Sequence, residues 1–129
     1  MSEKSKRLLE MMMKKRGYIY PSYRMLAEDD PEFLETYDKL YELAMLRTRI
    51  FPEKIKELFF ICAIAARNPG DNSGMKNHMK RALEKGATKE EILEALKCAF
   101  IPGGALTLLY SINTLIDVIK ERDASIGRA

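Results

Sequence analysis

The chain has 129 residues, of which 47% are hydrophobic and 32% charged, a composition typical of globular rather than disordered proteins. Its net charge of +3 arises from 22 basic and 19 acidic residues that are interleaved along the sequence, which argues against nucleic acid as a partner. No apolar stretch reaches the length of about 20 residues that spans a membrane, and the amino terminus lacks a signal-peptide core, so we expect a cytoplasmic protein without a membrane partner.

The N-terminal part is expected to form one helix followed by a linker. Residues 3–16 form a short basic helix that ends at Gly17. Its expected apolar side consists of Leu8, Leu9, Met12 and Met13. The next stretch carries three tyrosines, and Pro21 disfavours helical structure at Tyr20. We therefore predict an irregular linker up to Asp30.

A second helix is predicted from Pro31 to about Thr48. Asp30 followed by proline is a helix-start signal, because the carboxylate caps the first turn and proline fits its first position. Apolar and aromatic residues recur at spacings of three and four, which predicts one buried stripe. The stripe consists of Phe33, Tyr37, Leu40, Tyr41 and Ala44.

The third helix, opened by Pro52, is the most apolar segment of the chain. From Leu58 to Ala66 every residue is apolar, so the helix has no polar side to face water. A domain of this size has little interior to surround a whole helix. We therefore predict that neighbouring subunits cover part of it and that the protein is a homo-oligomer.

A fourth helix carries His78, the only histidine of the chain, and stops at Gly86. Proline and glycine break the chain at residues 68–74, where a polar side chain is expected to cap the new helix. The candidate caps are Asp71, Asn72 and Ser73. Apolar residues are expected on the same face as the imidazole, namely Met75, Met79 and Ala82.

Two more helices complete an all-α prediction of six helices and no sheet. Thr88 with Glu91 three residues later forms a capping box for a helix through about Phe100. The segment 102–104 then interrupts the chain, and a last helix follows over residues 105–119, with a frayed polar tail. Its predicted inward side chains are Leu108, Leu109, Ile112, Leu115, Ile116 and Ile119.

The two cysteines do not form a metal-binding pattern. Cys62 and Cys98 are separated by 36 residues, and with a single histidine the chain predicts no metal site and no cofactor. Both fit the role of small hydrophobic side chains, although Cys98 is kept as a possible reactive thiol. A structural disulfide is not expected in the cytoplasm.

Several of these motifs together resemble the carboxymuconolactone decarboxylase family of the alkyl hydroperoxidase D-like superfamily. They are KELFFICAIAARN, a glycine-containing break, NHMKRALEKGATKEEILEAL and the PGG turn before the last helix. The resemblance covers about residues 30–120, within a single domain of residues 1–129. It implies an all-helical subunit that assembles into trimers or hexamers, with its site in a cleft near a subunit boundary.

The sequence departs from the redox members of this superfamily at two positions. Those members carry a Cys-x-x-Cys pair shortly before the histidine, and the corresponding positions here are Asp71 and Gly74. A dithiol cycle needs a nucleophilic and a resolving cysteine. Glu57 stands at the place of the family's proton-relay glutamate, with a segment before His78 that is about two residues longer.

The decarboxylase branch also lacks the cysteine pair, and the resemblance therefore favours a lyase that acts on a lactone or keto acid. Loss of a carboxylate leaves negative charge that must be delocalised and then protonated. His78 is the candidate acid and base, and Glu57 is its partner. The candidate substrate contacts are Lys76, Arg81, Phe60, Met75, Met79 and Gly103.

Other interpretations remain open for the same residues. His78 can be a buried histidine held by a carboxylate without catalysis, Glu57 can favour the positive end of its helix, and the lysines near His78 can form a solvated face. Two further functions are therefore considered. One is a redox protein that uses a single cysteine, and the other is a non-catalytic helical oligomer that binds a ligand or partner.

Overall fold

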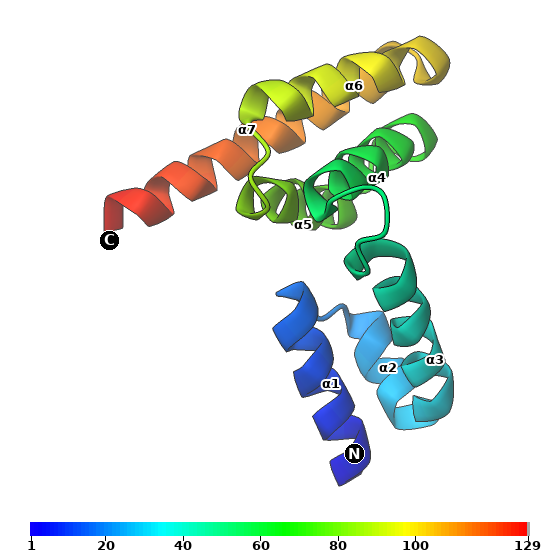
Figure 1. Cartoon of the computed structure of the whole chain (residues 1–129). Coiled ribbons are helices and arrows are strands. Elements are labelled where there is room, and N and C mark those ends of the chain that lie inside the picture. The colour runs from blue at the N-terminus through cyan, green and yellow to red at the C-terminus, as the bar shows by residue number, and fades with distance from the viewer. Residues whose placement is uncertain (129) are drawn as a thin grey trace. The chain divides into compact units, whose positions relative to one another are not determined.

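The computed structural model describes residues 1–128, and this range is helical with short connections and no strand. It contains seven α-helices and one π-helical segment (Figure 1). Their bounds are α1 Glu3–Arg16, α2 Pro21–Asp29, α3 Pro31–Tyr41, η1 Glu42–Leu46, α4 Glu53–Arg67, α5 Asn72–Glu84, α6 Lys89–Gly103 and α7 Ala105–Arg128. The all-α prediction is confirmed, but the prediction of six helices is wrong by one.

The additional helix lies in the segment that we expected to be a linker. Pro21 is the first residue of α2, and Tyr20 before it has the extended conformation that proline imposes, with φ −77° and ψ 151°. That conformation suits a residue that precedes a helix, since proline has no N–H to lose in a first turn. Tyr23 and Ala27, one turn apart, are buried and hold α2 in place.

The chain forms two compact units, Met1–Arg47 and the part from Thr48 onward. In the first unit, α1, α2 and α3 pack around a small apolar core. Its buried members are Leu8, Leu9, Met12, Tyr23, Ala27 and Leu34. Met13, which was expected among them, is exposed.

The first unit also buries a charged cluster around Arg16. The guanidinium of Arg16 donates one hydrogen bond to the Asp38 carboxylate at 2.9 Å and another to the Tyr23 hydroxyl at 3.0 Å. Lys15 binds the same carboxylate. Burial raises the pKa of the Tyr23 phenol, so this side chain accepts the bond in its neutral form.

This cluster explains why the predicted buried stripe of α3 is wrong. The helix turns Leu34 and Asp38 inward, while Phe33, Tyr37 and Leu40 are exposed. An apolar pattern with spacings of three and four is compatible with more than one rotation of a short helix. Here the ion pair with Arg16 and the burial of Leu34 select the rotation.

The second unit consists of α4, α5, α6 and α7, and the contacts between the helices define their directions. Lys54 pairs with Glu91 at 2.9 Å, so the first turns of α4 and α6 lie together and the two helices run parallel. Glu57 meets His78 and Glu53 meets Arg81, so α5 runs antiparallel to α4. The main core of this unit consists of Ile61, Ala65, Met75, Met79, Ala82, Ala87, Ile92, Leu96, Ala99, Leu115 and Val118.

The ends of α5 and α6 follow the sequence signals closely. The Asp71 carboxylate accepts a hydrogen bond from the Gly74 amide at 3.1 Å and caps α5, and Thr88 and Glu91 form the predicted capping box of α6. The helix α6 continues through Pro102 and ends only at Gly104, whose φ of 90° turns the chain into α7. The break is therefore one residue wide.

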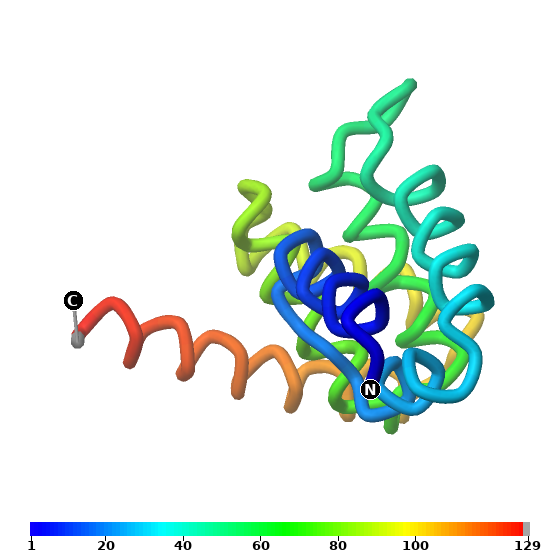
Figure 2. Tube along the Cα trace, turned by 90° about the horizontal axis from the view of Figure 1, so that it is seen from below, coloured from blue at the N-terminus to red at the C-terminus, as the bar shows by residue number. Residues whose placement is uncertain are grey.

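The last helix is longer than predicted and rotated differently. It continues to Arg128, and its final turns project past the other helices of the second unit (Figure 2). Leu109 and Ile116 are exposed, contrary to the prediction. Its buried face instead carries small polar residues as well as apolar ones, namely Thr107, Ser111, Thr114, Leu115 and Val118. Within residues 1–128, none of the helices combines the length and apolar character that a bilayer crossing requires.

The projecting part of α7 is fixed to α5 by Glu121, and this predicts a pH effect. Hydrogen bonds from Lys76 and then Lys80 lower the pKa of Glu121 from 4.5 to about 2. A carboxylate with a lowered folded-state pKa stabilises the fold above its unfolded pKa, and the effect is lost as the pH falls from about 4.5 to about 2. We expect Glu121→Gln to lower the thermal midpoint slightly at pH 7 and not at pH 2, as measured by circular dichroism. An equal difference at both pH values would contradict the assignment.

Candidate functional site

The candidate site is built around a buried contact between α4 and α5. Nδ1 of His78 lies 2.6 Å from Oε2 of Glu57, and the two residues are only 3% and 2% exposed. The predicted approach of these side chains within hydrogen-bond distance is therefore confirmed, although the loop between their helices is longer than in the redox relatives. The longer loop does not shift the two helices out of register.

The carboxylate fixes the chemistry of the imidazole. An ionised Glu57 can only accept a hydrogen bond, so Nδ1 of His78 carries a proton and donates it. In the neutral ring the remaining nitrogen, Nε2, is then the basic one. This is the arrangement in which a carboxylate orients a histidine and stabilises its protonated form.

Phe60 completes the immediate surroundings of the histidine. Its ring stacks on the imidazole with centroids 3.6 Å apart and an angle of 21° between the planes. Phe60 lies three residues after Glu57, so the carboxylate and the aromatic ring come from successive turns on one side of α4. The imidazole is thus held by a hydrogen bond at its edge and by a ring on its face.

The two methionines expected at the site are part of the core. Met75 and Met79 are fully buried on α5, on either side of His78 in sequence, and both belong to the main core of the second unit. Phe59, the other aromatic candidate, is exposed and stacks edge-on with Phe51 at 5.2 Å.

The structure separates the candidate basic contacts from one another. Arg81 lies one turn after His78 and pairs with Glu53, one turn before Glu57, with 3.5 Å between nitrogen and oxygen. The α4–α5 contact therefore contains two successive acid–base pairs. Lys76 lies on a different side of α5 and pairs with Glu121 at 2.5 Å. Only Arg81 shares the interface that holds the histidine.

Gly103 lies far along the helices from the histidine. Since α4 and α6 run parallel from the Lys54–Glu91 pair, Gly103 lies about nine residues beyond the level of Glu57, or roughly 14 Å. A side chain there would collide with Thr107, whose hydroxyl would be 2.4 Å from the added carbon. In this chain the glycine permits the close packing of α6 on α7.

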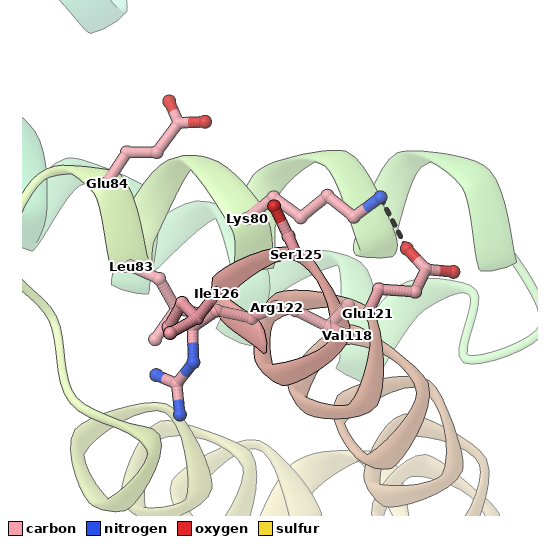
Figure 3. A pocket seen from close by; sticks show the side chains of 8 residues that line it. All are labelled: Lys80, Leu83, Glu84, Val118, Glu121, Arg122, Ser125 and Ile126. Atoms are coloured by element: carbon pink, nitrogen blue, oxygen red, sulfur yellow. Dashed lines mark ion pairs between the residues drawn. The ribbon is translucent and has the colours of Figure 1, made fainter. Parts of the chain in front are cut away.

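A separate hollow of about 440 Å³ lies between α5 and the projecting end of α7 (Figure 3). It is lined by Lys80, Leu83, Glu84, Val118, Glu121, Arg122, Ser125 and Ile126. Neither His78 nor Glu57 borders it. Among residues 1–128, no three side chains of the metal-binding types are grouped to hold an ion.

Sequence reasoning missed two features near these helices. The buried hydroxyl of Thr114 on α7 donates a hydrogen bond to Asn72 at the start of α5, at 3.1 Å. The spacing of Thr107, Ser111 and Thr114 by four and three residues was the available signal for this face. The second feature is the position of Arg81 on the same interface as the histidine, which its spacing of three from His78 also indicated.

The positions that hold the redox cysteines in relatives serve here as a helix cap. A side chain at Gly74 would meet the Asp71 carboxylate at 2.7 Å, so the glycine and the capping aspartate fit one another. We expect no dithiol-dependent peroxidase activity from this chain, because neither residue can form a disulfide. Peroxide consumption in the presence of a dithiol reductant would be measured, with a Cys-x-x-Cys relative as the positive control. Turnover matching that control and lost in Cys98→Ser would contradict the prediction.

Comparison with known proteins places these observations in a family. The model of the carboxymuconolactone decarboxylase family matches residues 31–114. An uncharacterised protein of Methanocaldococcus jannaschii is 27% identical over 92 residues, which are 71% of this chain and 83% of that protein. A crystal structure of a Burkholderia xenovorans protein, provisionally assigned as a carboxymuconolactone decarboxylase, has a similar fold. The TM-score is 0.77 at 20% identity, over 94% of this chain and 98% of that one.

Proposed function

Because this chain belongs to the carboxymuconolactone decarboxylase family, we propose that it is a small-molecule lyase or decarboxylase in which His78 is the acid–base residue. The observation that carries the proposal is the 2.6 Å contact between His78 and Glu57, two side chains that are almost fully buried. Buried charged pairs contribute little to stability compared with apolar side chains of similar volume. A pair of this kind is more useful for moving a proton than for holding the fold.

The proposed reaction uses Nε2 of the imidazole. Decarboxylation of a carboxylated lactone or keto acid leaves an electron pair on carbon, which is delocalised as an enolate and then protonated. Protonated His78 delivers that proton from Nε2, and Glu57 stabilises the protonated ring through Nδ1. Phe60 fixes the plane of the ring and limits water access to it.

We assign the recognition of the substrate carboxylate to Arg81 rather than to Lys76. Arg81 lies one turn from His78 and its side chain is largely buried against α4, where it pairs with Glu53. A planar guanidinium can bind a carboxylate with two parallel hydrogen bonds. Since His78 is 3% exposed, substrate reaches the imidazole only after Phe60 or a neighbouring side chain moves.

The proposal is tested by offering the purified protein a carboxylated muconolactone and measuring release of carbon dioxide. The same lactone without the extra carboxylate serves as the control substrate. We expect release from the first compound only, and its loss in His78→Gln. Absence of release from the wild-type protein, or equal release by the variant, would overturn the proposal and favour a non-catalytic role for the buried pair.

The proposed assembly is a homo-oligomer, either a trimer or a hexamer. The second unit exposes several large apolar side chains around the junction of α6 and α7, including Ile101 at 80%, Leu106 at 59% and Leu109 at 58%. Burying each of them is worth about 1.5–3 kcal/mol. Such a concentration of apolar surface is typical of a subunit interface.

We expect sedimentation equilibrium at micromolar concentration to give a mass of three or six times 14.8 kDa. Leu109→Glu should shift the distribution toward monomer, because it places a charge in the proposed interface, whereas Glu94→Gln on an exposed polar site should not. A 14.8 kDa species for the unmodified protein would contradict the assembly.

A further inference from the structure

The two cysteines, which the proposed reaction does not use, lie at the same level of two adjacent helices. The Lys54–Glu91 ion pair aligns the first turns of the parallel helices α4 and α6, which lie side by side in Figure 1. Cys62 follows Lys54 by eight residues and Cys98 follows Glu91 by seven. At a rise of 1.5 Å per residue, Cys62 lies about 12 Å beyond Lys54 along α4, and Cys98 lies about 10.5 Å beyond Glu91 along α6.

The packing between these helices allows the two sulfur atoms to approach. Small residues, Ala65 on α4 and Ala99 on α6, are fully buried next to the cysteines in the core. Helices packed through small residues have axes roughly 8–10 Å apart, so facing Cα atoms are roughly 3.5–5.5 Å apart. That range overlaps the Cα separation of about 4.4–6.8 Å found in disulfides.

The electrostatic surroundings of the thiols agree with this placement. Burial raises the pKa of the Cys62 thiol, and the nearby Cys98 raises it further. Cys62 is half-buried against the core, whereas Cys98 is exposed at the surface of α6. One thiol is thus accessible to a reagent, and the other is behind it and less readily ionised.

We propose that Cys62 and Cys98 form a reversible disulfide that joins α4 to α6 and is made by exchange with a small-molecule disulfide. In the first step the Cys98 thiolate attacks one sulfur of the reagent, forming a mixed disulfide and expelling one thiolate. In the second step the Cys62 thiolate attacks Sγ of Cys98 and expels the second thiolate. The two protons lost by the cysteines are taken up by the two released thiolates, so the reagent is reduced to two thiols and the protein is oxidised by two electrons.

The cross-link would act on the helix that carries half of the candidate site. Cys62 lies two residues after Phe60 and five after Glu57 on α4. Joining this part of α4 to α6 restrains the motion of Phe60 that exposure of His78 requires. The oxidised protein therefore holds the histidine closed, and reduction releases it.

The test uses reduced full-length protein and 2-hydroxyethyl disulfide as the oxidant, followed by intact-mass measurement and peptide mapping without reduction. We expect a single chain that is lighter by two hydrogen atoms, with residues 62 and 98 in one linked peptide. Amide exchange in α4 should be slower in this form. The reduced mass should return on addition of excess thiol.

Single-cysteine variants separate the two steps. Cys62→Ser should stop at a stable adduct on Cys98, and Cys98→Ser should remain unmodified over the time in which the wild-type protein is fully oxidised. In denaturant, both wild-type cysteines should form adducts, which shows that the fold imposes the pairing. A persistent adduct on Cys98 in the native wild-type protein, a cross-link between two chains, or no reaction would each overturn the proposal.

Discussion

Asp38→Ala is expected to lower the free energy of unfolding of the first unit by about 3–5 kcal/mol, because it leaves the guanidinium of Arg16 buried without its carboxylate. Arg16 is 3% exposed, and Asp38 is its only acidic hydrogen-bond partner among the bonds described above. The Tyr41 ring, 3.8 Å from the guanidinium carbon, offers a cation–π contact that cannot replace a carboxylate. Loss of Asp38 also removes one of the acceptors of Lys15.

The tyrosines make this prediction measurable for one unit at a time. Five of the six tyrosines precede residue 48, Tyr110 is the sixth, and the chain has no tryptophan. Tyrosine fluorescence during urea unfolding therefore reports mainly on the first unit. Glu35→Ala is the matched control, since it breaks the exposed pair with Lys4 and should cost at most about 1 kcal/mol. Equal effects of the two variants would show that the buried cluster does not stabilise the unit.

The second large effect is expected on catalysis. His78→Gln should lower kcat/KM for the carboxylated substrate by about 10²–10⁴-fold, the usual contribution of one acid–base residue. The glutamine amide can still donate a hydrogen bond to Glu57, so the buried carboxylate keeps a partner and the thermal midpoint should change by only a few degrees. The comparison thus separates proton transfer from stability.

Two further variants make the interpretation specific. Glu57→Gln should leave the ring orientation intact, because an amide oxygen can accept from Nδ1, and should lower turnover less than the histidine variant does. Leu96→Met, a volume-conserving change in the same core, is the control and should keep full activity. A loss of turnover in the control as large as in His78→Gln would attribute the effect to packing.

Both effects arise from charged groups that the chain buries in pairs, but the two pairs were not equally visible in the sequence. His78 is a single histidine on an apolar face, and its surroundings, together with the family motifs, already indicated Glu57 as a partner. Arg16 stands among several basic residues near the end of a basic helix, and Asp38 is one of many acidic residues. Nothing local distinguishes these two from solvated charges, because their burial depends on how three helices pack.

The sequence by itself determined the helical class, the family and the helix ends that depend on local chemistry.

Results

Sequence analysis

The chain has 129 residues, of which 47% are hydrophobic and 32% charged, a composition typical of globular rather than disordered proteins. Its net charge of +3 arises from 22 basic and 19 acidic residues that are interleaved along the sequence, which argues against nucleic acid as a partner. Because the chain has no segment of about 18 uninterrupted apolar residues that could span a membrane, and no signal-peptide core, we expect a cytoplasmic protein without a membrane partner.

The N-terminal part is expected to form one helix followed by a linker. Residues 3–16 form a short basic helix that ends at Gly17. Its expected apolar side consists of Leu8, Leu9, Met12 and Met13. The next stretch carries three tyrosines, and Pro21 disfavours helical structure at Tyr20. We therefore predict an irregular linker up to Asp30.

A second helix is predicted from Pro31 to about Thr48. Asp30 followed by proline is a helix-start signal, because the carboxylate caps the first turn and proline fits its first position. Apolar and aromatic residues recur at spacings of three and four, which predicts one buried stripe. The stripe consists of Phe33, Tyr37, Leu40, Tyr41 and Ala44.

The third helix, opened by Pro52, is the most apolar segment of the chain. From Leu58 to Ala66 every residue is apolar, so this stretch has no polar side to face water. A domain of this size has little interior to surround a whole helix. We therefore predict that neighbouring subunits cover part of it and that the protein is a homo-oligomer.

A fourth helix carries His78, the only histidine of the chain, and stops at Gly86. Proline and glycine break the chain at residues 68–74, where a polar side chain is expected to cap the new helix. The candidate caps are Asp71, Asn72 and Ser73. Apolar residues are expected on the same face as the imidazole, namely Met75, Met79 and Ala82.

Two more helices complete an all-α prediction of six helices and no sheet. Thr88 with Glu91 three residues later forms a capping box for a helix through about Phe100. The segment 102–104 then interrupts the chain, and a last helix follows over residues 105–119, with a frayed polar tail. Its predicted inward side chains are Leu108, Leu109, Ile112, Leu115, Ile116 and Ile119.

The two cysteines do not form a metal-binding pattern. Cys62 and Cys98 are separated by 36 residues, and with a single histidine the chain predicts no metal site and no cofactor. Both fit the role of small hydrophobic side chains, although Cys98 is kept as a candidate reactive thiol. A structural disulfide is not expected in the cytoplasm.

Several of these motifs together resemble the carboxymuconolactone decarboxylase family of the alkyl hydroperoxidase D-like superfamily. They are KELFFICAIAARN, a glycine-containing break, NHMKRALEKGATKEEILEAL and the PGG turn before the last helix. The resemblance covers about residues 30–120, within a predicted single domain of residues 1–129. It implies an all-helical subunit that assembles into trimers or hexamers, with its site in a cleft near a subunit boundary.

The sequence departs from the redox members of this superfamily at two positions. Those members carry a Cys-x-x-Cys pair shortly before the histidine, and the corresponding positions here are Asp71 and Gly74. A dithiol cycle needs a nucleophilic and a resolving cysteine. Glu57 stands at the place of the family's proton-relay glutamate, with a segment before His78 that is longer by about two residues.

The decarboxylase branch also lacks the cysteine pair, and the resemblance therefore favours a lyase that acts on a lactone or keto acid. Loss of a carboxylate leaves negative charge that must be delocalised and then protonated. His78 is the candidate acid and base, and Glu57 is its partner. The candidate substrate contacts are Lys76, Arg81, Phe60, Met75, Met79 and Gly103.

Other interpretations remain open for the same residues. His78 can be a buried histidine held by a carboxylate without catalysis, Glu57 can favour the positive end of its helix, and the lysines near His78 can form a solvated face. Two further functions are therefore considered. One is a redox protein that uses a single cysteine, and the other is a non-catalytic helical oligomer that binds a ligand or partner.

Overall fold

The computed structural model describes residues 1–128, and this range is helical with short connections and no strand. It contains seven α-helices and one π-helical segment (Figure 1). Their bounds are α1 Glu3–Arg16, α2 Pro21–Asp29, α3 Pro31–Tyr41, η1 Glu42–Leu46, α4 Glu53–Arg67, α5 Asn72–Glu84, α6 Lys89–Gly103 and α7 Ala105–Arg128. The all-α prediction is confirmed, but the prediction of six helices is one too few.

The additional helix lies in the segment that we expected to be a linker. Pro21 is the first residue of α2, and Tyr20 before it has the extended conformation that proline imposes, with φ −77° and ψ 151°. That conformation suits a residue that precedes a helix, since proline has no N–H to lose in a first turn. Tyr23 and Ala27, one turn apart, are buried and hold α2 in place.

The chain forms two compact units, Met1–Arg47 and the part from Thr48 onward. In the first unit, α1, α2 and α3 pack around a small apolar core. Its buried members are Leu8, Leu9, Met12, Tyr23, Ala27 and Leu34. Met13, which was expected among them, is exposed.

The first unit also buries a charged cluster around Arg16. The guanidinium of Arg16 donates one hydrogen bond to the Asp38 carboxylate at 2.9 Å and another to the Tyr23 hydroxyl at 3.0 Å. Lys15 binds the same carboxylate. Burial raises the pKa of the Tyr23 phenol, so this side chain accepts the bond in its neutral form.

This cluster explains why the predicted buried stripe of α3 is wrong. The helix turns Leu34 and Asp38 inward. The exposed side carries Phe33, Tyr37 and Leu40. An apolar pattern with spacings of three and four is compatible with more than one rotation of a short helix. Here the ion pair of Asp38 and the burial of Leu34 select the rotation.

The second unit consists of α4, α5, α6 and α7, and ion pairs between the helices define their directions. Lys54 pairs with Glu91 at 2.9 Å, so the first turns of α4 and α6 lie together and the two helices run parallel. Arg81 in the last turn of α5 pairs with Glu53 at the start of α4, so these two helices run antiparallel. The main core of this unit consists of Ile61, Ala65, Met75, Met79, Ala82, Ala87, Ile92, Leu96, Ala99, Leu115 and Val118.

The ends of α5 and α6 follow the sequence signals in part. The Asp71 carboxylate accepts a hydrogen bond from the Gly74 amide at 3.1 Å and caps α5. Thr88 and Glu91 form the predicted capping box of α6. The helix α6 continues beyond its predicted end and stops only at Gly104, whose φ of 90° turns the chain into α7. The interruption predicted over residues 102–104 is therefore a single residue, Gly104.

The last helix is longer than predicted and rotated differently. It continues to Arg128, and its final turns project past the other helices of the second unit (Figure 2). Leu109 and Ile116 are exposed, contrary to the prediction. Its buried face instead carries Thr107, Ser111, Thr114, Leu115 and Val118. Within residues 1–128, none of the helices combines the length and apolar character that a bilayer crossing requires.

The projecting part of α7 is fixed to α5 by Glu121, and this predicts a pH effect. Hydrogen bonds from Lys76 and then Lys80 lower the pKa of Glu121 from 4.5 to about 2. A carboxylate with a lowered folded-state pKa stabilises the fold above its unfolded pKa, and the effect is lost as the pH falls from 4.5 to about 2. We expect Glu121→Gln to lower the thermal midpoint slightly near neutral pH and not at the acid end of this range, as measured by circular dichroism. An equal decrease of the thermal midpoint near neutral pH and at the acid end would contradict the lowered pKa of Glu121.

Candidate functional site

The candidate site is built around a buried contact between α4 and α5. Nδ1 of His78 lies 2.6 Å from Oε2 of Glu57, and the two residues are only 3% and 2% exposed. Glu57, which the sequence analysis gave as the partner of His78, therefore lies within hydrogen-bond distance of it.

The carboxylate fixes the chemistry of the imidazole. An ionised Glu57 can only accept a hydrogen bond, so Nδ1 of His78 carries a proton and donates it. In the neutral ring the remaining nitrogen, Nε2, is then the basic one. This is the arrangement in which a carboxylate orients a histidine and stabilises its protonated form.

Phe60 completes the immediate surroundings of the histidine. Its ring stacks on the imidazole with centroids 3.6 Å apart and an angle of 21° between the planes. Phe60 lies three residues after Glu57, so the carboxylate and the aromatic ring come from one side of α4. The imidazole is thus held by a hydrogen bond at its edge and by a ring on its face.

The two methionines expected at the site are part of the core. Met75 and Met79 are fully buried on α5, on either side of His78 in sequence, and both belong to the main core of the second unit. These two positions of α5 are therefore closed to solvent. Phe59, next to Phe60 in sequence, is exposed and contacts Phe51 edge to face, with ring centroids 5.2 Å apart.

The structure separates the candidate basic contacts from one another. Arg81 lies one turn after the histidine and pairs with Glu53, one turn before Glu57, with 3.5 Å between nitrogen and oxygen. The contact between α4 and α5 therefore contains two successive acid–base pairs. Lys76 lies on a different side of α5 and pairs with Glu121 at 2.5 Å. Of these two basic residues, Arg81 is the one that shares the interface with the histidine.

Gly103 lies far along the helices from the histidine. Since α4 and α6 run parallel from the Lys54–Glu91 pair, Gly103 lies about nine residues beyond the level of Glu57, or roughly 14 Å. A side chain there would collide with Thr107, whose hydroxyl oxygen would be 2.4 Å from the added carbon. In this chain the glycine permits the close packing of α6 on α7.

A separate hollow of about 440 Å³ lies between α5 and the projecting end of α7 (Figure 3). It is lined by Lys80, Leu83, Glu84, Val118, Glu121, Arg122, Ser125 and Ile126. Neither His78 nor Glu57 borders it. Among residues 1–128, no three side chains of the metal-binding types are grouped to hold an ion.

Sequence reasoning missed two features of these helices. The buried hydroxyl of Thr114 on α7 donates a hydrogen bond to Asn72 at the start of α5, at 3.1 Å. The spacing of Thr107, Ser111 and Thr114 by four and three residues was the available signal for this face. The second feature is the pairing of Arg81 with Glu53 across the interface that holds His78. Arg81 follows His78 by three residues, and this spacing was the available signal that both lie on one face of the helix.

The positions that hold the redox cysteines in relatives serve here as a helix cap. A side chain at Gly74 would meet the Asp71 carboxylate at 2.7 Å, so the glycine and the capping aspartate fit one another. We expect no dithiol-dependent peroxidase activity from this chain, because neither residue can form a disulfide. Peroxide consumption with a dithiol reductant would be measured, with a Cys-x-x-Cys relative as the positive control. Turnover that matches this control and is lost in Cys98→Ser would contradict the prediction.

Comparisons with known proteins agree with the resemblance seen in the sequence. The model of the carboxymuconolactone decarboxylase family matches residues 31–114. An uncharacterised protein of Methanocaldococcus jannaschii is 27% identical over 92 residues, which are 71% of this chain and 83% of that protein. A crystal structure of a Burkholderia xenovorans protein, provisionally assigned as a carboxymuconolactone decarboxylase, has a similar fold. The TM-score is 0.77 at 20% identity, over 94% of this chain and 98% of that one.

Proposed function

Because this chain belongs to the carboxymuconolactone decarboxylase family, we propose that it is a small-molecule lyase or decarboxylase in which His78 is the acid–base residue. The observation that carries the proposal is the 2.6 Å contact between His78 and Glu57, two side chains that are almost fully buried. Buried charged pairs contribute little to stability compared with apolar side chains of similar volume. A pair of this kind is more useful for moving a proton than for holding the fold.

The proposed reaction uses Nε2 of the imidazole. Decarboxylation of a carboxylated lactone or keto acid leaves an electron pair on carbon, which is delocalised as an enolate and then protonated. Protonated His78 delivers that proton from Nε2, and Glu57 stabilises the protonated ring through Nδ1. Phe60 fixes the plane of the ring and limits water access to it.

We assign the recognition of the substrate carboxylate to Arg81 rather than to Lys76. Arg81 lies one turn from His78, and its side chain is only 14% exposed where it pairs with Glu53. A planar guanidinium can bind a carboxylate with two parallel hydrogen bonds. Since His78 is almost fully buried, substrate reaches the imidazole only after Phe60 or another neighbouring side chain moves.

The proposal is tested by offering the purified protein a carboxylated muconolactone and measuring release of carbon dioxide. The same lactone without the extra carboxylate serves as the control substrate. We expect release from the first compound only, and its loss in His78→Gln. Absence of release from the wild-type protein, or equal release by the variant, would overturn the proposal and favour a non-catalytic role for the buried pair.

The proposed assembly is a homo-oligomer, either a trimer or a hexamer. The second unit exposes several large apolar side chains around the junction of α6 and α7, including Ile101 at 80%, Leu106 at 59% and Leu109 at 58%. Burying each of them is worth about 1.5–3 kcal/mol. Such a concentration of apolar surface is typical of a subunit interface.

We expect sedimentation equilibrium at micromolar concentration to give a mass of three or six times 14.8 kDa. Leu109→Glu should shift the distribution toward monomer, because it places a charge in the proposed interface. Glu94→Gln, a change at an exposed polar position, is the control and should have no effect. A 14.8 kDa species for the unmodified protein would contradict the assembly.

A further inference from the structure

The two cysteines, which the proposed reaction does not use, lie at the same level of two adjacent helices. The Lys54–Glu91 ion pair aligns the first turns of the parallel helices α4 and α6, which pack against each other (Figure 1). Cys62 follows Lys54 by eight residues and Cys98 follows Glu91 by seven. At a rise of 1.5 Å per residue, Cys62 lies about 12 Å beyond Lys54 along α4, and Cys98 lies about 10.5 Å beyond Glu91 along α6.

The packing between these helices allows the two sulfur atoms to approach. Small residues close to the cysteines in sequence, Ala65 on α4 and Ala99 on α6, are fully buried in the shared core. Packed helices have axes roughly 8–10 Å apart, so facing Cα atoms are roughly 3.5–5.5 Å apart. That range overlaps the Cα separation of about 4.4–6.8 Å found in disulfides.

The surroundings of the thiols agree with this placement. Burial raises the pKa of the Cys62 thiol, and the nearby Cys98 raises it further. Cys62 is half-buried against the core, whereas Cys98 is exposed. One thiol is thus accessible to a reagent, and the other is less accessible and less readily ionised.

We propose that Cys62 and Cys98 form a reversible disulfide that joins α4 to α6 and is made by exchange with a small-molecule disulfide. In the first step the Cys98 thiolate attacks one sulfur of the reagent, forming a mixed disulfide and expelling one thiolate. In the second step the Cys62 thiolate attacks Sγ of Cys98 and expels the second thiolate. The two protons lost by the cysteines are taken up by the two released thiolates, so the reagent is reduced to two thiols and the protein is oxidised by two electrons.

The cross-link acts on the helix that carries half of the candidate site. Cys62 lies two residues after Phe60 and five after Glu57 on α4. Joining this part of α4 to α6 restrains the motion of Phe60 that exposure of His78 requires. The oxidised protein therefore keeps the histidine closed, and reduction releases it.

The test uses reduced full-length protein and 2-hydroxyethyl disulfide as the oxidant, followed by intact-mass measurement and peptide mapping without reduction. We expect a single chain that is lighter by two hydrogen atoms, with Cys62 and Cys98 in one linked peptide. Amide exchange in α4 should be slower in this form. The reduced mass should return on addition of excess thiol.

Single-cysteine variants separate the two steps. Cys62→Ser should stop at a stable adduct on Cys98, and Cys98→Ser should remain unmodified over the time in which the wild-type protein is fully oxidised. In denaturant, both wild-type cysteines should form adducts, which would show that the fold imposes the pairing. A persistent adduct on Cys98 in the native wild-type protein, a cross-link between two chains, or no reaction would each overturn the proposal.

Discussion

Asp38→Ala is expected to lower the free energy of unfolding of the first unit by about 3–5 kcal/mol, because it leaves the guanidinium of Arg16 buried without its carboxylate. Arg16 is 3% exposed and donates to Asp38 at 2.9 Å. The Tyr41 ring, whose centroid is 3.8 Å from the guanidinium carbon, offers a cation–π contact that cannot replace a carboxylate. Loss of Asp38 also removes an acceptor of Lys15.

The tyrosines make this prediction measurable for one unit at a time. Five of the six tyrosines precede residue 48, Tyr110 is the sixth, and the chain has no tryptophan. Tyrosine fluorescence during urea unfolding therefore reports mainly on the first unit. Glu35→Ala is the matched control, since it breaks the exposed pair with Lys4 and should cost at most about 1 kcal/mol. Equal effects of the two variants would show that the buried cluster does not stabilise the unit.

The second large effect is expected on catalysis. His78→Gln should lower kcat/KM for the carboxylated substrate by about 10²–10⁴-fold, the usual contribution of one acid–base residue. The glutamine amide can still donate a hydrogen bond to Glu57, so the buried carboxylate keeps a partner. The thermal midpoint should therefore change by only a few degrees, and the comparison separates proton transfer from stability.

Two further variants make the interpretation specific. Glu57→Gln should leave the ring orientation intact, because an amide oxygen can accept from Nδ1, and should lower turnover less than the histidine variant does. Leu96→Met, a volume-conserving change in the same core, is the control and should keep full activity. A loss of turnover in the control as large as in His78→Gln would attribute the effect to packing.

Both effects arise from charged groups that the chain buries in pairs, but the two pairs were not equally visible in the sequence. His78 is a single histidine on an apolar face, and the family motifs around it already indicated Glu57 as a partner. Arg16 stands among several basic residues at the end of a basic helix, and Asp38 is one of many acidic residues. Nothing local distinguishes these two from solvated charges, because their burial depends on how three helices pack.

The sequence by itself determined the helical class, the family and the helix ends that depend on local chemistry. The Asp71 cap and the capping box of Thr88 and Glu91 follow from interactions within a few residues of the chain. The sequence also predicted the contact between Glu57 and His78, because a short break between two apolar helices favours an antiparallel arrangement.

Only the tertiary structure decided the helical state of residues 21–29, the rotation of α3 and α7, and the burial of Arg16 with Asp38. Each of these depends on partners that are distant in sequence. A stripe with spacings of three and four tolerates rotation by one position, and the free energy that selects one rotation comes from the neighbouring helices. The same reason explains why Cys62 and Cys98, 36 residues apart, became a candidate pair only when α4 and α6 were seen to run parallel.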